Sequence, residues 1–98
     1  MNLSTEQLEM VEEMAGLFFS TDDIAICLEM NEQQGEEFAD GVALKATGVP
    51  IIAAYHRGWL SGEVLLRKAI KQAALNGSSP SQQQLLNFQK ENRKYPNG

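Results

Sequence analysis

One stretch decides the fold class of this 98-residue chain, the sequence FSTDDIAICL at residues 19–28. Ser20 suits a helix N-cap, because its hydroxyl can accept a hydrogen bond from the backbone N–H three residues on. Phe19 and Ile24 have the spacing of a hydrophobic staple, which fixes how the chain enters a helix. The stretch therefore predicts a short helix that begins at Thr21 and buries Ile24.

Helices are also predicted on both sides of this stretch. Ser4 and Gln7 have the spacing of a capping box for a first helix that ends near Phe19. The second helix is expected to stop near Asn31, because asparagine tolerates the left-handed conformation. A third helix is expected from about Glu32 to Ala46, although two internal glycines weaken it.

A clear break follows at residues 48–50, Gly-Val-Pro, since glycine suits a helix end and proline suits the first turn of the next helix. A long fourth helix is expected from Pro50 to Leu75. A fifth helix is expected to open with Ser79 as N-cap, Pro80 in the first turn and Gln82 as the reciprocal capping residue.

No β-type alternation of useful length occurs, so the sequence predicts an all-α protein. We expect an acidic helix-turn-helix-like module of three helices in residues 1–47 and a basic helical hairpin in residues 48–98, within one compact domain. The formal net charge is -5. Eleven acidic residues and one basic residue lie in the first segment, and two acidic and seven basic residues lie in the second. This balance argues against a generic basic nucleic-acid binder and indicates charged partners for each half.

Several classes of protein are not expected. No apolar run approaches the roughly 20 residues that span a bilayer, and the first residues do not resemble a secretory signal. Cys27 is the single cysteine and cannot form an internal disulfide. We therefore expect a cytoplasmic protein with no membrane partner.

Catalysis is not expected either. Cys27 and His56 are the only residues of their kinds, they lie on different predicted helices, and we expect the cysteine to be buried as a small apolar residue. The carboxylates have no metal-ligand spacing, and no phosphate-binding loop is present. The sequence predicts no catalytic residues, no metal, no cofactor and no enzymatic activity.

The order of three motifs carries a family resemblance. YHRG at residues 55–58 stands early in a long helix, and LRKAI at 66–70 and AALNGSSPS at 73–81 follow it. Behind a helix-turn-helix that covers about residues 4–40, this order resembles the small terminase subunits of tailed bacteriophages and their prophage relatives. The resemblance covers about residues 3–93.

That resemblance implies a ring-shaped homo-oligomer that recognises double-stranded DNA at a packaging site and docks a large ATPase–nuclease subunit. In a helix-turn-helix the second helix enters the major groove, where Gln33 and Gln34 can read base edges. The same predicted helix departs from the pattern, because four carboxylates on it would repel phosphates: Glu32, Glu36, Glu37 and Asp40. The alternative function is a helical protein-binding adaptor that does not bind DNA.

The candidate DNA-binding residues are Gln33, Gln34, Lys45, Arg57, Arg67, Lys68 and Lys71. Arg67 and Lys71 share a helix face because they lie four residues apart. Two other interpretations of the basic residues are open. They can form an ordinary solvated face, or they can pair with the acidic half of a neighbouring subunit in a head-to-tail assembly.

The candidate oligomer interface is a smooth helix face with two aromatic neighbours: Ala54, Tyr55, Gly58, Trp59 and Gly62. Small residues four apart let another backbone approach closely, from a second subunit or from the first or fifth helix of the same chain. The two aromatic side chains are of the kind enriched at interfaces, and a half-buried place in the core is the alternative.

Overall fold

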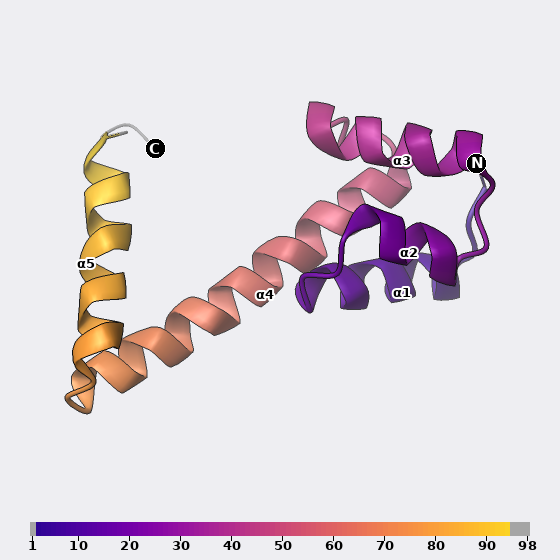
Figure 1. The fold of residues 1–98 in the computed structure, drawn as a ribbon. Helices are drawn as coiled ribbons and strands as arrows, with labels where there is room; N and C mark the ends of the chain where they lie inside the picture. Colours follow the sequence, from indigo (N-terminus) through magenta and orange to yellow (C-terminus); the bar gives the residue numbers. More distant parts are fainter. Residues whose placement is uncertain (1, 95–98) are drawn as a thin grey trace. The chain divides into compact units, whose positions relative to one another are not determined.

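The computed structural model describes residues 2–94, with side chains as far as Glu91, and its fold is all-α as the sequence predicts (Figure 1). Its helices are α1 (Thr5–Gly16), α2 (Thr21–Cys27), α3 (Glu32–Leu44), α4 (Pro50–Leu75) and α5 (Ser79–Lys94). No strand occurs in this part of the chain. Within the same residues, no helix combines the length and the apolar character that crossing a membrane requires.

Side chains cap the starts of the first three helices. Gln7 N–H donates to Ser4 Oγ at 3.1 Å and Ser4 N–H donates to Gln7 Oε1 at 2.8 Å, which completes the predicted capping box of α1. Ser20 Oγ accepts from the backbone three residues on at 3.2 Å, as predicted for α2. Asn31 does not end α2, contrary to our expectation. Its backbone is extended, and with Gln34 it forms a second capping box that starts α3, with bonds of 2.8 and 3.0 Å.

The first three helices end earlier than the sequence predicts. A residue with left-handed backbone follows each of them closely: Phe18 (φ 64°), Glu29 (φ 55°) and Lys45 (φ 54°). Residues with large side chains rarely adopt this backbone conformation, which is usually found at glycine or asparagine. In each case the next residue donates its N–H to the carbonyl five residues back, at 3.0–3.1 Å, so local backbone hydrogen bonds close the three helix ends.

The connection between α4 and α5 differs in detail from the prediction. Ser78, and not Ser79, caps α5, because Ser78 Oγ accepts from Ser81 N–H at 3.4 Å. Gln82 does not return to the capping residue. Its amide donates to the carbonyl of Ala74 at 3.0 Å, which also accepts from Gly77 N–H, so Gln82 ties α5 to the last turn of α4.

The chain forms two compact units, an N-terminal unit of residues 1–63 and a C-terminal unit of residues 64–98. The boundary therefore lies inside α4, and not at the predicted break at residue 48. The first turns of α4 belong to the N-terminal core, whose buried residues are Val11, Ile24, Phe38, Ile51, Ile52 and Ala54. This core fixes α1, α2, α3 and the start of α4 as one body.

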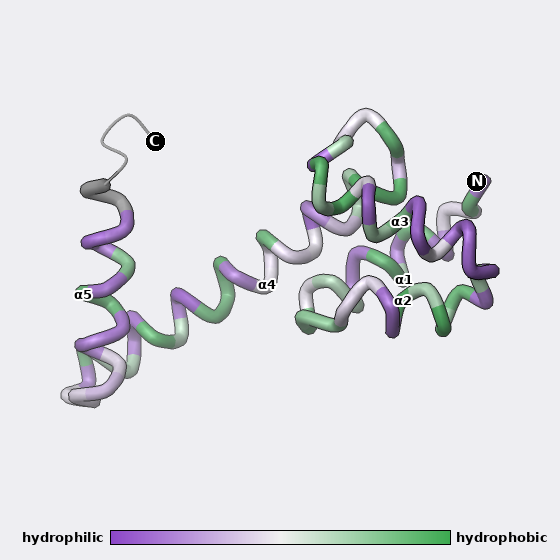
Figure 2. Tube along the Cα trace, turned by 45° about the horizontal axis from the view of Figure 1, so that its top comes forward, coloured by the Kyte–Doolittle hydropathy of each residue, from purple (hydrophilic) through white to green (hydrophobic). Residues whose placement is uncertain are grey.

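The C-terminal unit has a much thinner core. Of its described residues only Ile70 and Ala74 are buried. Along α5, hydrophobic positions alternate with hydrophilic ones (Figure 2). Large apolar side chains are exposed on both of its helices: Val64, Leu65, Leu66, Leu75 and Leu86. A two-helix unit of this size cannot bury enough apolar surface on its own.

Candidate functional site

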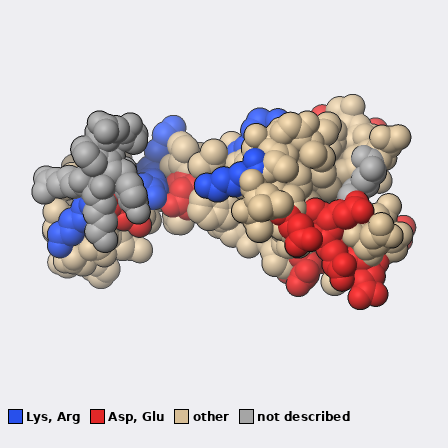
Figure 3. Space-filling view, turned by 90° about the horizontal axis from the view of Figure 1, so that it is seen from above, with Lys and Arg blue, Asp and Glu red and all other residues tan. Residues whose placement is uncertain are grey.

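Charge separates along the same boundary as the two units. The N-terminal unit contains twelve acidic and two basic residues, whereas the C-terminal unit contains one acidic and six basic residues. Figure 3 shows Asp and Glu side chains gathered on one side of the N-terminal unit. The two units therefore offer surfaces of opposite sign to any charged partner.

The order of α2, a short turn and α3 fits the predicted helix-turn-helix. Glu29 takes the left-handed conformation in this turn, and α2 and α3 pack against each other. The second helix of the pair has a strongly acidic exposed surface: Glu32, Glu36, Glu37 and Asp40. Such a surface gains nothing from releasing the counterions of DNA.

Both candidate base-reading glutamines already have partners. Gln34 accepts from the Asn31 backbone through its side-chain oxygen, as part of the α3 capping box. Gln33 Nε2 donates to Glu37 Oε1 at 3.3 Å. Each side chain is therefore already held by one hydrogen bond inside the chain.

The C-terminal unit brings three of the candidate basic residues together. A basic groove of about 350 Å³ is lined by Val64, Arg67, Lys68, Lys71, Leu85, Phe88 and Gln89. The Arg67 guanidinium lies over the Phe88 ring, 4.0 Å from its centre, and 3.8 Å from Glu91 Oε2. Stacking and pairing hold this guanidinium at the groove, which the two lysines also line.

The other two candidate cations belong to the N-terminal unit. Arg57 Nε lies 3.1 Å from Glu12 Oε1, so it ties α4 to α1. Lys45 caps the end of α3. Neither residue lines the basic groove, so the candidate cations that come together there are Arg67, Lys68 and Lys71.

The small-residue face of α4 packs against α1 of the same chain. A Cβ on Gly58 would meet the carbonyl of Glu12, and a Cβ on Gly62 would meet the carbonyl of Gly16. Ala54 is fully buried. These residues serve the intrachain crossing, which is the alternative that the sequence left open, and they are covered before a second subunit could reach them.

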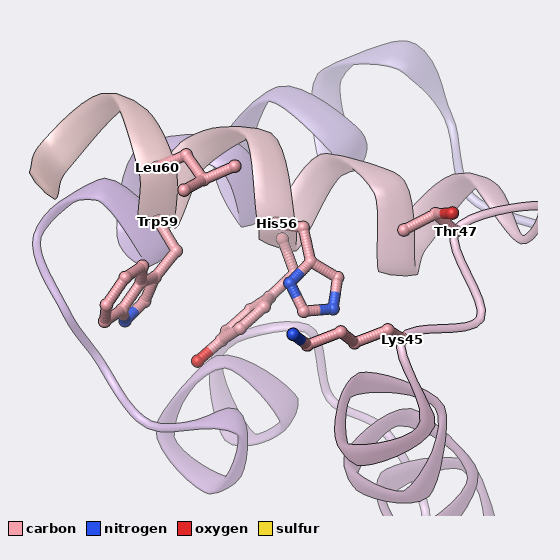
Figure 4. A pocket seen from close by; sticks show the side chains of 6 residues that line it. Lys45, Thr47, His56, Trp59 and Leu60 are labelled. Atoms are coloured by element: carbon pink, nitrogen blue, oxygen red, sulfur yellow. The ribbon is translucent and has the colours of Figure 1, made fainter. Parts of the chain in front are cut away.

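The two aromatic candidates line a cavity instead. This aromatic pocket has a volume of about 510 Å³ and is lined by Lys45, Thr47, Tyr55, His56, Trp59 and Leu60 (Figure 4). Trp59 is 39% exposed. The sequence reasoning missed Thr47, His56 and Leu60 as lining residues. The neighbouring aromatic residues in YHRGW were the only local signal, because the remaining wall comes from the end of α3.

Two further expectations concern reactive residues. Cys27 is exposed, so the prediction that it is buried is wrong. It is the last residue of α2, whereas His56 lines the aromatic pocket on α4. Within residues 2–94, no group of three His, Cys, Asp or Glu side chains is placed to hold a metal ion.

Comparisons with models of known protein families, with curated proteins and with solved structures found no match to this chain. Its function must therefore be argued from the two surfaces described above, the basic groove and the acidic face of α3, together with the aromatic pocket.

Proposed function

We propose that this chain is a non-enzymatic, cytoplasmic DNA-packaging protein that resembles a small terminase subunit and works as a homo-oligomer beside a large packaging subunit. The observation that carries the proposal is the basic groove. Arg67, Lys68 and Lys71 meet in one place on the C-terminal unit, where they can contact consecutive phosphates. DNA is held there, and not by α3.

The number of cations in the groove sets how strongly DNA binding should depend on salt. Three phosphate contacts per chain correspond to a slope of about -2.7 in a plot of log affinity against log salt concentration. Raising the salt from about 50 to about 200 mM then weakens binding roughly 40-fold for one groove. Binding by a single chain is weak, so useful affinity requires several grooves to act together.

The thin core of the C-terminal unit supports an oligomer. Only Ile70 and Ala74 are buried among its described residues, and the exposed leucines provide apolar surface for contact between subunits. Units with so small a core usually gain stability by association. A stable monomer at micromolar concentration, measured by sedimentation or light scattering, would contradict this part of the proposal.

The decisive experiment is a salt titration of binding to labelled double-stranded DNA, read by fluorescence anisotropy. A groove variant replaces Arg67, Lys68 and Lys71 with glutamine. A control variant of identical net charge replaces Lys45, Arg57 and Lys90 with glutamine instead. We expect the groove variant to lose both affinity and salt slope while the control binds within a few-fold of the native chain. Absence of binding at about 50 mM salt, or equal losses in both variants, would refute it.

A second candidate function is a helical adaptor that binds proteins and no DNA. The specific observation in its favour is α3, whose exposed surface is acidic and whose glutamines are both engaged within the chain. The same titration separates the two functions. Absence of DNA binding by the folded chain would leave the adaptor as the better account.

A further inference from the structure

The aromatic pocket has walls that are fixed before anything binds. The Trp59 ring meets the Phe18 ring edge-on, with centres 5.5 Å apart and planes at 76°. Tyr55 is held the same way by Phe38 at 5.8 Å and by His56 at 5.7 Å. Such edge-to-face pairs are favourable beyond the apolar area that they bury. These ring contacts pack the aromatic walls of the pocket against other residues of the N-terminal unit.

Two unusual backbone conformations support this pocket. Phe18 and Lys45 have positive φ angles of 64° and 54°, although neither is glycine or asparagine. Phe18 stands behind the Trp59 wall, and Lys45 lines the pocket itself. The chain thus accepts a disfavoured conformation at two positions, of which Lys45 lines the pocket and Phe18 contacts its Trp59 wall.

Two polar side chains of the pocket, those of Lys45 and His56, lack a partner among the residues that the structure describes. Lys45 forms no ion pair with any residue that the structure describes, although the N-terminal unit contains twelve acidic residues. Arg57, the other basic residue of that unit, is paired with Glu12. The Lys45 side chain lies beside the His56 ring (Figure 4), whose buried Nε2 finds no hydrogen-bond partner within residues 2–94. A bound carboxylate would give the lysine the partner it lacks.

We propose that the aromatic pocket docks a peptide segment of a protein partner in which a large apolar side chain stands next to a carboxylate. The apolar side chain fills the hollow beside Trp59 and Tyr55, and the carboxylate pairs with Lys45. A protein segment fits better than a small ligand, because the pocket is open to exposed apolar side chains, Leu60 on its wall and Phe18 beside Trp59. Tryptophan and tyrosine are also the residues that most often dominate binding at protein interfaces. This inference goes beyond DNA binding and does not depend on it.

The chain provides its own probe, because Trp59 is its single tryptophan. We would select random twelve-residue peptides displayed on phage against the full chain, with counter-selection against a Leu60→Glu variant. Leu60 is 60% exposed, so this substitution leaves the core intact while it places a competing carboxylate at the pocket. Enriched peptides are expected to combine a large apolar residue with an adjacent Asp or Glu. Their synthetic copies are then titrated against the chain by Trp59 fluorescence.

Three matched variants test the assignment. Leu65→Glu makes the same change on the C-terminal unit and is expected to leave the dissociation constant unchanged, whereas Leu60→Glu is expected to abolish binding. Lys45→Gln is expected to weaken binding about three- to fivefold, the range of an exposed charge pair, and Lys90→Gln is expected to leave it unchanged.

The proposal is overturned if nothing is enriched on the native chain over Leu60→Glu, if the enriched peptides are basic, or if Lys45→Gln binds as tightly as the native chain. A second copy of the chain is the competing occupant. It would appear as a lower solution mass of Leu60→Glu, with no peptide enriched, and that result also overturns the proposal. No DNA is present in these measurements, so their failure leaves the basic groove to be judged by its own titration.

Discussion

The Gly58→Ala substitution tests the crossing of α1 and α4, because it adds one methyl group where two backbones meet. A Cβ at residue 58 would lie 2.7 Å from the carbonyl carbon of Glu12, and closer still to its oxygen. Ordinary contacts between carbon atoms are about 3.5–4.0 Å. Backbone cannot rotate out of the way as a side chain can, so the two helices would have to separate by about 1 Å.

The expected change in the free energy of unfolding is the sum of two opposing effects. Forcing a methyl group into packed structure costs typically about 1–3 kcal/mol, and the upper end applies because the obstacle is backbone. Alanine in place of glycine inside a helix raises the free energy of unfolding by about 1 kcal/mol. We therefore expect Gly58→Ala to lower the free energy of unfolding by about 2 kcal/mol. For a domain of this size that loss lowers the melting temperature by roughly 8–16 °C.

Gly35→Ala is the matched control. It makes the same change inside α3, where the new Cβ would lie 3.7 Å from the Ala25 Cβ, an ordinary contact. We expect this variant to gain about 1 kcal/mol from helix propensity alone. Urea unfolding followed by Trp59 fluorescence gives the free energy of unfolding of the N-terminal unit for both variants. If Gly58→Ala were as stable as Gly35→Ala, the close crossing of α1 and α4 would be refuted.

Three other substitutions have defined outcomes in the same unfolding assay. Phe38→Ala is expected to cost about 3–5 kcal/mol, because this ring is 1% exposed and packs at the centre of the N-terminal core; a loss below about 1 kcal/mol would contradict that position. Asn31→Ala is expected to cost about 1 kcal/mol through loss of the α3 capping box, and an unchanged unfolding curve would speak against the cap. Gly41→Ala is expected to change stability by less than about 1 kcal/mol, because its new Cβ meets side-chain atoms only, Cδ1 of Ile52 at 2.7 Å and Cγ1 at 3.0 Å, and a side chain can shift where backbone cannot; a loss as large as that of Gly58→Ala would show that Ile52 cannot move.

The sequence predicts where the helices start and that α4 ends at Leu75, whereas it places the ends of α1, α2 and α3 too late. Ser4 and Ser20 cap their own helices through bonds that reach only three residues along the chain, so a local pattern is enough to find them. The first three ends depend on Phe18, Glu29 and Lys45, which adopt the left-handed conformation without being residues that favour it. Local backbone hydrogen bonds close these ends, but the residue types at the three positions give no signal for that conformation.

The candidate surfaces, too, could be predicted only in part from the sequence. Periodicity placed Arg67 and Lys71 on one face of a helix, and the structure adds Lys68 and the apolar floor from α5. Periodicity also found the smooth face of α4, but it could not tell which helix would cover it. The aromatic pocket could not be predicted from the sequence, because Lys45 and Trp59 come together only when the N-terminal core folds.

The helix-turn-helix order of α2 and α3 does not by itself make this chain a DNA-binding protein. Affinity for DNA comes largely from cations that replace the counterions of phosphates, and α3 presents carboxylates in their place. Those charges are fixed in the sequence, so no rearrangement of α3 could turn it into an attractive surface. Whatever salt dependence the chain shows must therefore arise from the C-terminal unit, where the basic residues gather. A slope near -2.7 per chain would assign it to the three cations of the groove, and a slope near zero would leave both surfaces of the N-terminal unit to protein partners.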